Sequence, residues 1–349
     1  MFKKNKKIFI TGISGLLGSH LARFLLRTTD YTIVGADNFI GSEKNVLDDL
    51  LPNKNFEFHE FDITKNLNQF IEITKGVDCL FHTSCLPFEG LASFSPKLIT
   101  TSIIEGSSAV GVVAAQNKIR RVLNFSSNAR YGDINSPFKE EHIPHPCDPY
   151  GIAKLAAENI LTNLGNTHNF EILSFVPHNA FGLGKYDDPF RSVINIFINL
   201  LLQNKQCYIY GDGNQLRKII FAKEIVYQIA HFIDCKIDIN GDIFNLGNKN
   251  PPVSINELYK TITKLLNIDI EPIYTAERPN EVKIAFSSCE KLQTKLKNEN
   301  VFVPSISLEE GIGDIITYIK EKGVKPFKYH IDLEITNEKT PETWQKKLF

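Results

Sequence analysis

Residues 8–26 read IFITGISGLLGSHLARFLL and carry the most specific pattern in the chain. A short run of β-branched and aromatic residues leads into Gly12, Gly15 and Gly18, spaced as G-x-x-G-x-x-G, and apolar residues then recur with helical spacing. Glycines at these positions allow a tight turn from strand to helix and let a pyrophosphate approach the backbone closely. The start of the helix adds unpaired N–H groups and the positive end of its dipole. The stretch therefore predicts a dinucleotide site.

The ends of the following apolar runs supply the polar groups that such a site needs. The second run, YTIVGADN, ends in Asp37, nineteen residues beyond Gly18, where a carboxylate can accept hydrogen bonds from both hydroxyls of an adenine ribose. A 2′-phosphate would meet a like charge there, so the sequence predicts NAD rather than NADP. Asp62 and Ile63, in FHEFDI, are expected beside the adenine. His82, which ends CLFH, is expected either beside the phosphates or in the core with its ring hydrogen-bonded.

Short apolar runs alternate with helical patterns through the first half of the chain, which is typical of a parallel sheet covered by helices. We expect strands at 7–11, 32–37, 56–61, 79–82, 121–125 and 172–176, and helices at 16–28, 67–73, 100–116 and 149–164. After residue 177 the pattern becomes mixed, with helices expected near 191–203, 255–266 and 308–320. The sequence predicts an α/β protein: a Rossmann doubly wound parallel sheet over residues 1–177, to which some later segments return, a smaller mixed α/β C-terminal substrate lobe over 178–325, and an extension over 326–349.

The composition excludes several classes of protein. The 349 residues include 39 Lys and Arg against 40 Asp and Glu, so nothing points to nucleic acid. The six cysteines form no C-x-x-C pair and lie without His at metal spacing, so we expect reduced thiols, a cytoplasmic location and no metal site. The basic start is followed by too few apolar residues for a signal peptide. The longest apolar stretch, Val193–Leu202, is well short of the ~20 residues that span a bilayer, so no membrane segment is expected.

A second motif carries groups that can move a proton. The segment DPYGIAKLAAENIL places Tyr150 and Lys154 four residues apart, on one face of a helix that begins at or just after Pro149. A phenol titrates near ~10 and becomes a useful base once a nearby cation stabilises the phenolate, so Lys154 is expected to lower the pKa of Tyr150. The run RRVLNF leads into Ser126 and Ser127 at a strand end, where a hydroxyl can bind a substrate oxygen. Beside an NAD site these groups describe a carbinol–carbonyl redox centre.

These motifs, in this order, resemble the extended short-chain dehydrogenase/reductases, the family of NAD-dependent nucleotide-sugar epimerases and dehydratases. The resemblance covers about residues 7–320 and includes NAFG at 179–182, YGDGNQLR at 210–217 and RPNEV at 278–282. The implied catalytic residues are Ser127, Tyr150 and Lys154. The implied cofactor-binding residues are Gly12, Gly15, Leu16, Leu17, Gly18, Asp37, Asn38, Asp62, Ile63, His82, Tyr150 and Lys154.

The resemblance also implies how a nucleotide-diphosphate sugar, with UDP favoured, would bind. Arg217 and Arg278 match positions that hold the diphosphate, where a planar guanidinium can grip two oxygens. The implied substrate-binding residues are Ser127, Asn128, Asn179, Arg217 and Arg278. Tyr208 or Tyr210 is expected by the base, although both also suit ordinary strand positions. The resemblance further implies a homodimer through the helices near 100–117 and 149–164.

Members of this family that catalyse different reactions differ in the residues that follow the catalytic Ser or Thr. Dehydratases carry Asp-Glu there and the xylose-forming decarboxylases carry a Glu, whereas this chain has Asn128 and Ala129, which can act neither as acid nor as base. The resemblance is thus closest to UDP-hexose 4-epimerases, with carbon 4 of a UDP-hexose or UDP-N-acetylhexosamine as the reacting centre. Three alternatives stay open. They are a 2-epimerase, because an Asn after the hydroxyl residue is similar to the paratose/tyvelose-type epimerases, a dehydrogenase or keto-sugar reductase, and a non-catalytic NAD-binding sensor.

Some segments depart from the family pattern. Ile103 stands where Asn is usual, Val176 replaces a common Arg, and Lys218 replaces the Asp that normally follows Arg217. The region 85–96, expected to line the sugar pocket, matches no subgroup. The extension beyond residue 325 contains four aromatic residues that are expected to pack over the second lobe or onto a partner subunit: Phe327, Tyr329, Trp344 and Phe349.

Overall fold

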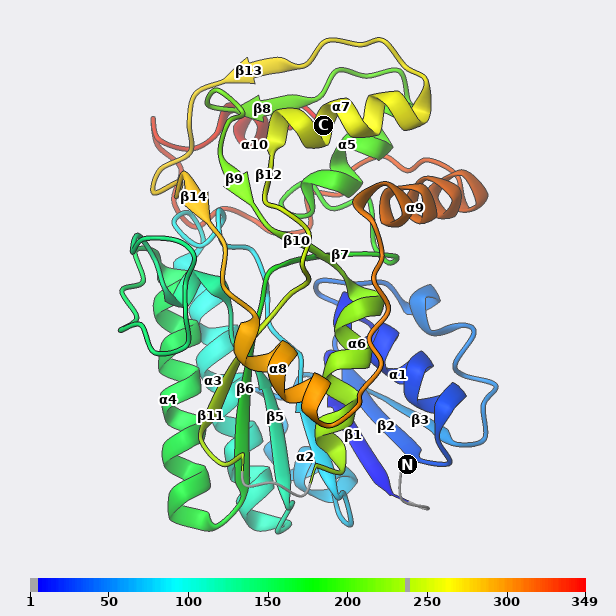
Figure 1. Cartoon of the computed structure of the whole chain (residues 1–349), viewed down its shortest axis with the longest axis vertical. Helices are drawn as coiled ribbons and strands as arrows, with labels where there is room; N and C mark the ends of the chain where they lie inside the picture. Colours follow the sequence, from blue (N-terminus) through cyan, green and yellow to red (C-terminus); the bar gives the residue numbers. More distant parts are fainter. Residues whose placement is uncertain (1–5, 236–238) are drawn as a thin grey trace.

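The computed structural model describes residues 6–235 and 239–349, and its largest element is a sheet of seven parallel strands (Figure 1). In sheet order the strands are β11 (Asp242–Leu246), β6 (Glu171–Pro177), β5 (Arg121–Phe125), β4 (Cys79–His82), β1 (Lys7–Thr11), β2 (Thr32–Asp37) and β3 (Phe56–Glu60). The chain builds the sheet outward from β1 to β3 and then crosses to β4 on the other side of β1. Ligands of open parallel sheets bind at this reversal of strand order, beyond the carboxyl ends of the strands.

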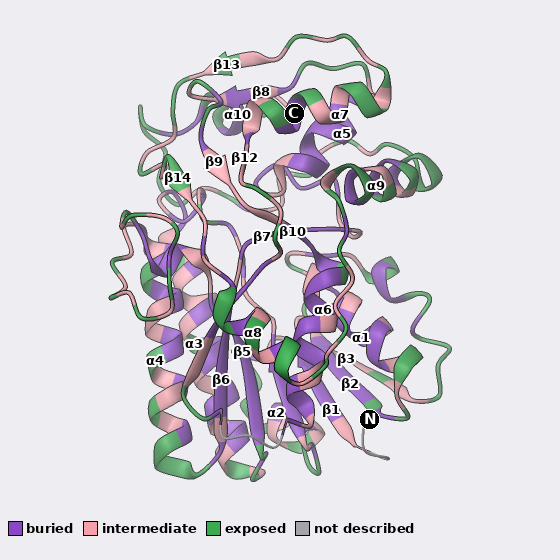
Figure 2. Ribbon diagram, viewed as in Figure 1, coloured by how far each residue is buried: buried purple, intermediate pink, exposed green. Residues whose placement is uncertain are grey.

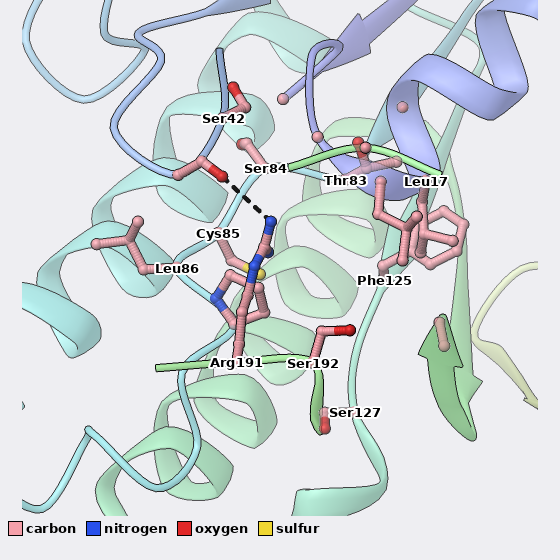
Figure 3. A pocket seen from close by; sticks show the side chains of 18 of the residues that line it. Leu17, Ser42, Thr83, Ser84, Cys85, Leu86, Phe125, Ser127, Arg191 and Ser192 are labelled. Atoms are coloured by element: carbon pink, nitrogen blue, oxygen red, sulfur yellow. Dashed lines mark hydrogen bonds between the residues drawn. The ribbon is translucent and has the colours of Figure 1, made fainter. Parts of the chain in front are cut away.

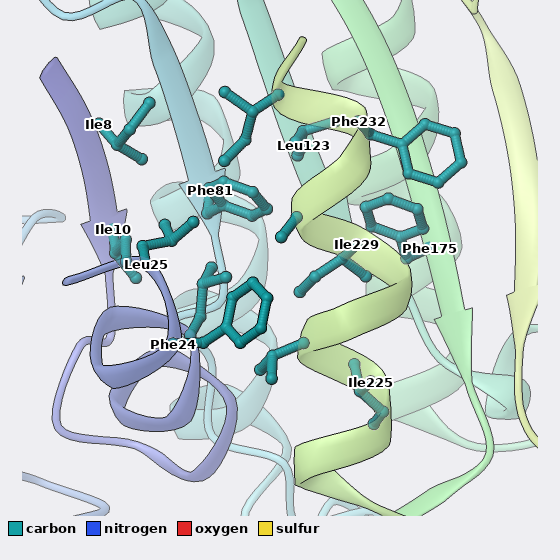
Figure 4. Packing of buried hydrophobic residues seen from close by; sticks show 14 of the residues in the cluster. Ile8, Ile10, Phe24, Leu25, Phe81, Leu123, Phe175, Ile225, Ile229 and Phe232 are labelled. Atoms are coloured by element: carbon teal, nitrogen blue, oxygen red, sulfur yellow. The ribbon is translucent and has the colours of Figure 1, made fainter. Parts of the chain in front are cut away.

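Helices cover both faces of the sheet, so alternate residues of the strands enter two separate cores. One face carries α1 (Leu16–Thr28), α6 (Ala222–Ala230) and α8 (Glu290–Asn298); the other carries α2 (Leu67–Ile73), α3 (Pro96–Gln116) and α4 (Pro149–His168). In β1, Ile8 and Ile10 enter the first core, which Figure 4 shows, and Phe9 enters the second. The central strands β4 and β5 are buried at every residue (Figure 2).

A smaller lobe lies beyond the carboxyl ends of the strands (Figure 1). Its strand pairs and triplet are β7 (Asn179–Phe181) with β10 (Ile219–Phe221), β8 (Tyr208–Tyr210) with β13 (Ile273–Thr275), and β9 (Leu216–Arg217) between β12 (Val253–Ser254) and β14 (Ile284–Ala285). Its helices are α5 (Val193–Leu202), α7 (Ile255–Leu266), α9 (Leu308–Lys322) and the short α10 (Glu342–Gln345). The described residues also form three short 3-10 turns: η1 (Lys44–Leu47), η2 (Asn128–Arg130) and η3 (His231–Ile233).

The predicted fold class is confirmed, and the largest differences from the expected bounds lie at the ends of two helices. Helix α3 begins at Pro96 instead of residue 100, because proline is well placed in the first turn of a helix. Helix α4 continues to His168 and ends at Asn169, whose φ of 60° is the left-handed conformation that often terminates helices. After β6 the chain enters the second lobe and then returns, so that α6, β11 and α8 all lie in the first lobe.

Helix α3 is, by length and composition alone, long and apolar enough to cross a membrane. The expectation that no membrane segment is present rested on the longest apolar stretch, Val193–Leu202, and did not consider this helix. In the structure α3 packs against α4, and Ile99, Ile103 and Val110 are among its buried residues. Helix α3 thus forms part of the layer that covers the sheet.

Candidate active site

A cavity of about 530 Å³ lies between the carboxyl ends of the parallel strands and the second lobe. The predicted site residues that line it are Gly12, Gly15, Leu16, Leu17, Gly18, Asp37, Asn38, Asp62, Ile63, Ser127, Asn128, Tyr150, Lys154, Asn179 and Arg217. Figure 3 shows part of the wall, with Leu17 on the side of the glycine turn and Ser127 and Arg191 nearby. His82 and Arg278 lie outside this lining. The structure therefore brings nearly all of the predicted residues to one cavity.

The glycine turn after β1 leaves room only for backbone. Gly12 has a φ of 66°, and a Cβ on it would lie 2.7 Å from the Cα of Ser84. A Cβ on Gly18 would lie 2.4 Å from the carbonyl oxygen of Gly12. Gly15 is the N-cap of α1, and within the described residues no side chain caps the helix, so its first N–H groups stay available for an anion. This turn fits the pyrophosphate of a dinucleotide.

Two carboxylates stand at the carboxyl ends of β2 and β3. One oxygen of Asp37 accepts the N–H of Ser14 at 3.0 Å, and this contact holds the carboxylate against the glycine turn. Asn38 donates to Asp62 at 3.2 Å. Burial opposes ionisation of Asp62, but hydrogen bonds from Thr64 and Asn38 outweigh it and leave the pKa of this carboxyl below its ordinary value. The pair suits the hydroxyls of an unmodified ribose and disfavours a 2′-phosphate.

His82 does not make the expected approach to the phosphates. Its two ring nitrogens are hydrogen-bonded to the hydroxyls of Thr11 and Ser107, each at 3.0 Å, and the residue is 4% exposed. Burial, with a smaller contribution from Lys154, lowers the pKa of His82 to about 3, so the ring is neutral at physiological pH. His82 thus ties β4 to β1 and α3, which is the core role that the sequence left open.

The three predicted catalytic residues meet at one wall of the cavity. Tyr150 lies in the first turn of α4, where the N-cap Asp148 accepts the N–H of Gly151 at 3.0 Å. Lys154 follows one turn later, and its Nζ lies 5.9 Å from the centre of the Tyr150 ring. Ser127 follows β5 and caps the η2 turn. A helix start and a strand end therefore hold a phenol, an ammonium and a hydroxyl together.

The ionisation of Tyr150 differs from the expectation that Lys154 lowers its pKa. Burial raises the pKa of Tyr150 well above its ordinary value, and Cys85 and Glu89 add to the rise, whereas the Ser127 hydroxyl opposes it. Burial is the largest cause, and Lys154 Nζ donates to the carbonyl oxygen of Phe125 at 2.8 Å. The phenol needs additional positive charge beside it before it can act as a base.

Asn128 is oriented by a residue far away in the sequence. Ser287 donates to Asn128 Oδ1 at 2.5 Å, across 159 positions. Asn128 Nδ2 is buried and, within the described residues, has no hydrogen-bond partner. Because Asn128 lines the cavity, this amide offers a donor to an oxygen of a bound ligand. No motif in the sequence indicates this role for Ser287.

The two predicted diphosphate arginines share one carboxylate. Arg217 Nη2 is 2.8 Å from Glu281 Oε1, and Arg278 reaches Glu281 Oε2 through Nε at 2.9 Å and Nη2 at 2.7 Å. Arg217 lines the cavity, whereas the guanidinium of Arg278 lies over the ring of Tyr210 at 5.0 Å. Arg278 is thus joined to the cavity wall through Glu281, which it shares with Arg217.

The tyrosines expected beside the base also lie outside the cavity lining. Tyr210 is covered by Arg278, and Tyr208 packs against Phe349 with ring centres 5.8 Å apart. Both follow the alternative that the sequence left open, that of ordinary strand residues.

Glu89 lines the cavity and was not among the predicted site residues. Loss of hydration, with a contribution from the carboxylate of Asp148, raises the pKa of Glu89 to about 7. Within the described residues no hydrogen bond or ion pair engages its side chain. It lies in the region 85–96 that matched no subgroup, so the sequence offered only its charge as a signal.

A cluster remote from the cavity brings together His231, Cys235 and Glu299, with ligand atoms within 4.8 Å of one another. His231 and Cys235 are four residues apart, a spacing that the expectation of no metal site had overlooked. The Glu299 carboxylate also pairs with Lys295 at 3.0 Å, so its charge already has two partners. The cluster is accounted for as an ion-pair network that joins η3 to the end of α8.

Comparison with known proteins places the chain in a family. It belongs to the NAD dependent epimerase/dehydratase family, whose model matches residues 8–247. It is 26% identical over 323 residues to a putative UDP-glucose 4-epimerase of Methanocaldococcus jannaschii, covering 90% of this chain and 98% of that protein. It is 24% identical over 328 residues to human dTDP-D-glucose 4,6-dehydratase, covering 90% of both. The family uses NAD, and the glycine turn and Asp37 fit that cofactor.

A solved structure shows the same architecture. The UDP-N-acetylglucosamine 4-epimerase of Methanobrevibacter ruminantium, in complex with UDP-N-acetylmuramic acid, matches with a TM-score of 0.82 and 25% sequence identity, covering 92% of this chain and all of that one. The family thus defines an NAD-dependent enzyme, and these relatives are named for more than one reaction, an epimerisation and a dehydration.

Proposed function

We propose that this protein is an NAD-dependent nucleotide-sugar epimerase that inverts carbon 4 of a UDP-hexose or UDP-N-acetylhexosamine through a transient 4-keto intermediate. One observation carries the proposal: Ser127, Tyr150 and Lys154 share the cavity with the glycine turn, while Asn128 and Ala129 follow the serine. Elimination of water needs an acid for the leaving hydroxyl, and neither of these side chains can supply one.

The residues of the chain divide the work of an epimerase between them. Tyr150 removes the proton of the sugar hydroxyl and later returns it, so one proton carrier serves both halves of the reaction. Ser127 positions the sugar oxygen, and the free amide hydrogens of Asn128 can bind a neighbouring oxygen. Lys154, one turn along the same helix, would bind the nicotinamide ribose. NAD would supply a reversible hydride acceptor, and its positive charge would offset the effect of burial on the pKa of Tyr150.

The proposal is tested by the ligand that the purified protein carries and by the product it forms. Protein should be denatured and the released cofactor identified by mass spectrometry and absorbance. Native protein should then be incubated with a panel of nucleotide sugars, without added cofactor, and followed by proton NMR. We expect bound NAD and an equilibrium mixture of two sugars that differ at carbon 4. Inversion at carbon 2, net accumulation of NADH with a keto sugar, or no turnover of any sugar would each contradict it.

Glu89 gives a pH dependence that can be checked by titration. Because its pKa is raised to about 7, Glu89 is mostly neutral at pH 6 and mostly ionised at pH 8. Ionisation adds a negative charge to a cavity that receives a diphosphate, so binding of a UDP-sugar should weaken about fivefold from pH 6 to pH 8, equivalent to ~1 kcal/mol of repulsion. Glu89→Gln should remove most of this dependence, measured by calorimetry on the NAD-bound protein.

A matched control for that titration is Glu277→Gln. Glu277 pairs with Lys283 at 2.6 Å and lies outside the cavity lining. This variant should keep the pH dependence of the wild type. If Glu89→Gln keeps it as well, Glu89 does not act on the ligand.

We also propose that the protein works as a cytoplasmic homodimer whose contact face is formed by α3 and α4. All six cysteines are free thiols, which suits a reducing compartment. The two helices lie side by side, and Ile152 on α4 is 54% exposed. A two-fold contact would bury this residue together with its symmetry copy.

Ile152→Arg should therefore weaken the dimer by at least about tenfold, because two like charges would meet at a desolvated contact. The measurement is molar mass by light scattering over a range of protein concentrations. Ile284→Arg, at a residue of β14 that is 49% exposed, is the control and should stay dimeric. A dimer of unchanged strength in Ile152→Arg would place the contact elsewhere.

A further inference from the structure

The C-terminal segment 326–349 crosses both lobes next to the cavity. Trp344 and Ile331 belong to the same hydrophobic cluster as the catalytic residue Tyr150. Trp344 packs edge-on against Phe94, in the loop after β4, and against Phe190 of the second lobe, with ring centres 6.0 and 5.6 Å apart. The segment therefore joins the loop that carries Glu89 to the second lobe.

Backbone contacts fix that loop in place. The N–H groups of Glu334 and Ile335 both donate to the carbonyl oxygen of Phe94 at 2.9 Å. The Glu334 carboxylate accepts the N–H groups of Lys97 and Leu98, at 2.8 and 3.0 Å, in the first turn of α3. These N–H groups have no partner within the helix, so a residue of the extension caps α3. The loop 85–95 thus lies between β4 and the first turn of α3, and the C-terminal segment caps that turn.

A second set of contacts leads to the arginine pair. Thr343 is fully buried, and its hydroxyl is hydrogen-bonded to the hydroxyl of Tyr210. The Tyr210 ring carries the guanidinium of Arg278, which shares Glu281 with Arg217. Gly90 lies against both Arg278 and Trp344, because a Cβ there would be 2.8 Å from Arg278 Nη1 and 3.6 Å from Trp344 Cη2.

We propose that the C-terminal segment is part of the substrate site, in which Thr343 and Trp344 position Tyr210 and Arg278 and thereby orient Arg217 toward the diphosphate of a nucleotide sugar. Thr343 and Trp344 are positioning residues, since they act through other side chains. The inference rests on the proposed function for its ligand class. It assigns a purpose to the part of the chain that lies beyond the family resemblance.

The test compares two threonines of the same segment. Thr343→Val removes the hydroxyl that holds Tyr210 and keeps the shape of the side chain. Thr340→Val is the matched control, because Thr340 is also buried and its hydroxyl accepts only the N–H of Asn337 within the segment. NAD-bound protein should be titrated by calorimetry with UDP, dTDP, GDP and CDP, and the tightest of these used for the variants. We expect Thr343→Val to weaken its binding about fivefold to tenfold and Thr340→Val to leave it within twofold.

Gly90→Ala provides an independent variant that displaces Arg278 itself. The group its Cβ would meet is the far end of a flexible side chain, so the fold should tolerate it, whereas diphosphate binding should weaken by a similar factor. With the active sugar, both variants should raise KM and leave kcat within twofold, a division that simple destabilisation does not produce. The inference is overturned if Thr343→Val and Gly90→Ala bind the nucleotide as tightly as the wild type, or if Thr340→Val weakens binding equally. It is also overturned if the wild-type protein binds none of the four nucleotides. If the variants weaken nucleotide binding as expected but no sugar is turned over, the inference stands and the proposed epimerase activity is rejected.

Discussion

Tyr150→Phe is expected to lower kcat by about 10³-fold while leaving NAD bound, because it removes one oxygen and with it the proton carrier of both half-reactions. The ring itself stays, so its packing in the cluster around Phe88, Ile103 and Trp344 is retained. The measurements are kcat by proton NMR, the amount of NAD per protomer by absorbance, and the melting temperature. A non-catalytic NAD sensor would show no change in cellular function on this substitution.

Tyr131→Phe is the matched control. Tyr131 is fully buried, and its hydroxyl donates to Asn245 Oδ1 at 2.9 Å, outside the cavity lining. Its loss should cost about 1 kcal/mol of stability and leave kcat unchanged. If Tyr150→Phe keeps kcat within tenfold of the wild type, another group carries the proton, and Glu89, whose raised pKa suits an acid or a base, is the residue to replace next.

The sequence predicted those parts of the site whose residues lie close together in the chain. The glycine turn, the Asp37 at the end of a strand and the Tyr150–Lys154 pair each have a fixed local spacing that follows from strand and helix geometry. Their meeting in one cavity follows in turn from the parallel sheet, since all its strands end at the same edge. Local pattern and sheet topology together were therefore sufficient to bring these three segments to one cavity.

The substrate side was less predictable because its contacts join distant segments. Glu281 meets Arg217 across 64 positions, and Thr343 meets Tyr210 across 133. No periodicity relates such pairs, so the sharing of Glu281 by two arginines had no signature in the sequence. The raised pKa of Tyr150 has a related origin, since it depends on burial, which does not follow from a four-residue spacing.

Gly18→Ala is expected to weaken NAD binding by about 30-fold, which tests whether the close packing of α1 on the turn forms the cofactor site. The new Cβ would lie 2.4 Å from the carbonyl oxygen of Gly12 and 2.8 Å from the Cα of Ile13, and both are backbone atoms that cannot rotate away. Helix α1 must therefore shift, and restoring its position on binding costs ~2 kcal/mol, in the range of overpacked cores. The measurement is NAD titration of cofactor-stripped protein by calorimetry.

Gly313→Ala separates this effect from the general consequences of replacing a helical glycine. Gly313 lies in α9, and a Cβ there meets nothing within 4 Å. Alanine at this position should raise the free energy of unfolding by about 0.5–1 kcal/mol and leave NAD affinity unchanged. If alanine weakens NAD binding at residue 18 and leaves it unchanged at residue 313, the lost affinity comes from the disturbed packing of α1 against the glycine turn. If Gly18→Ala binds NAD as tightly as the wild type, binding of the pyrophosphate does not require close packing of α1 on the glycine turn. The cofactor would then bind away from the start of α1.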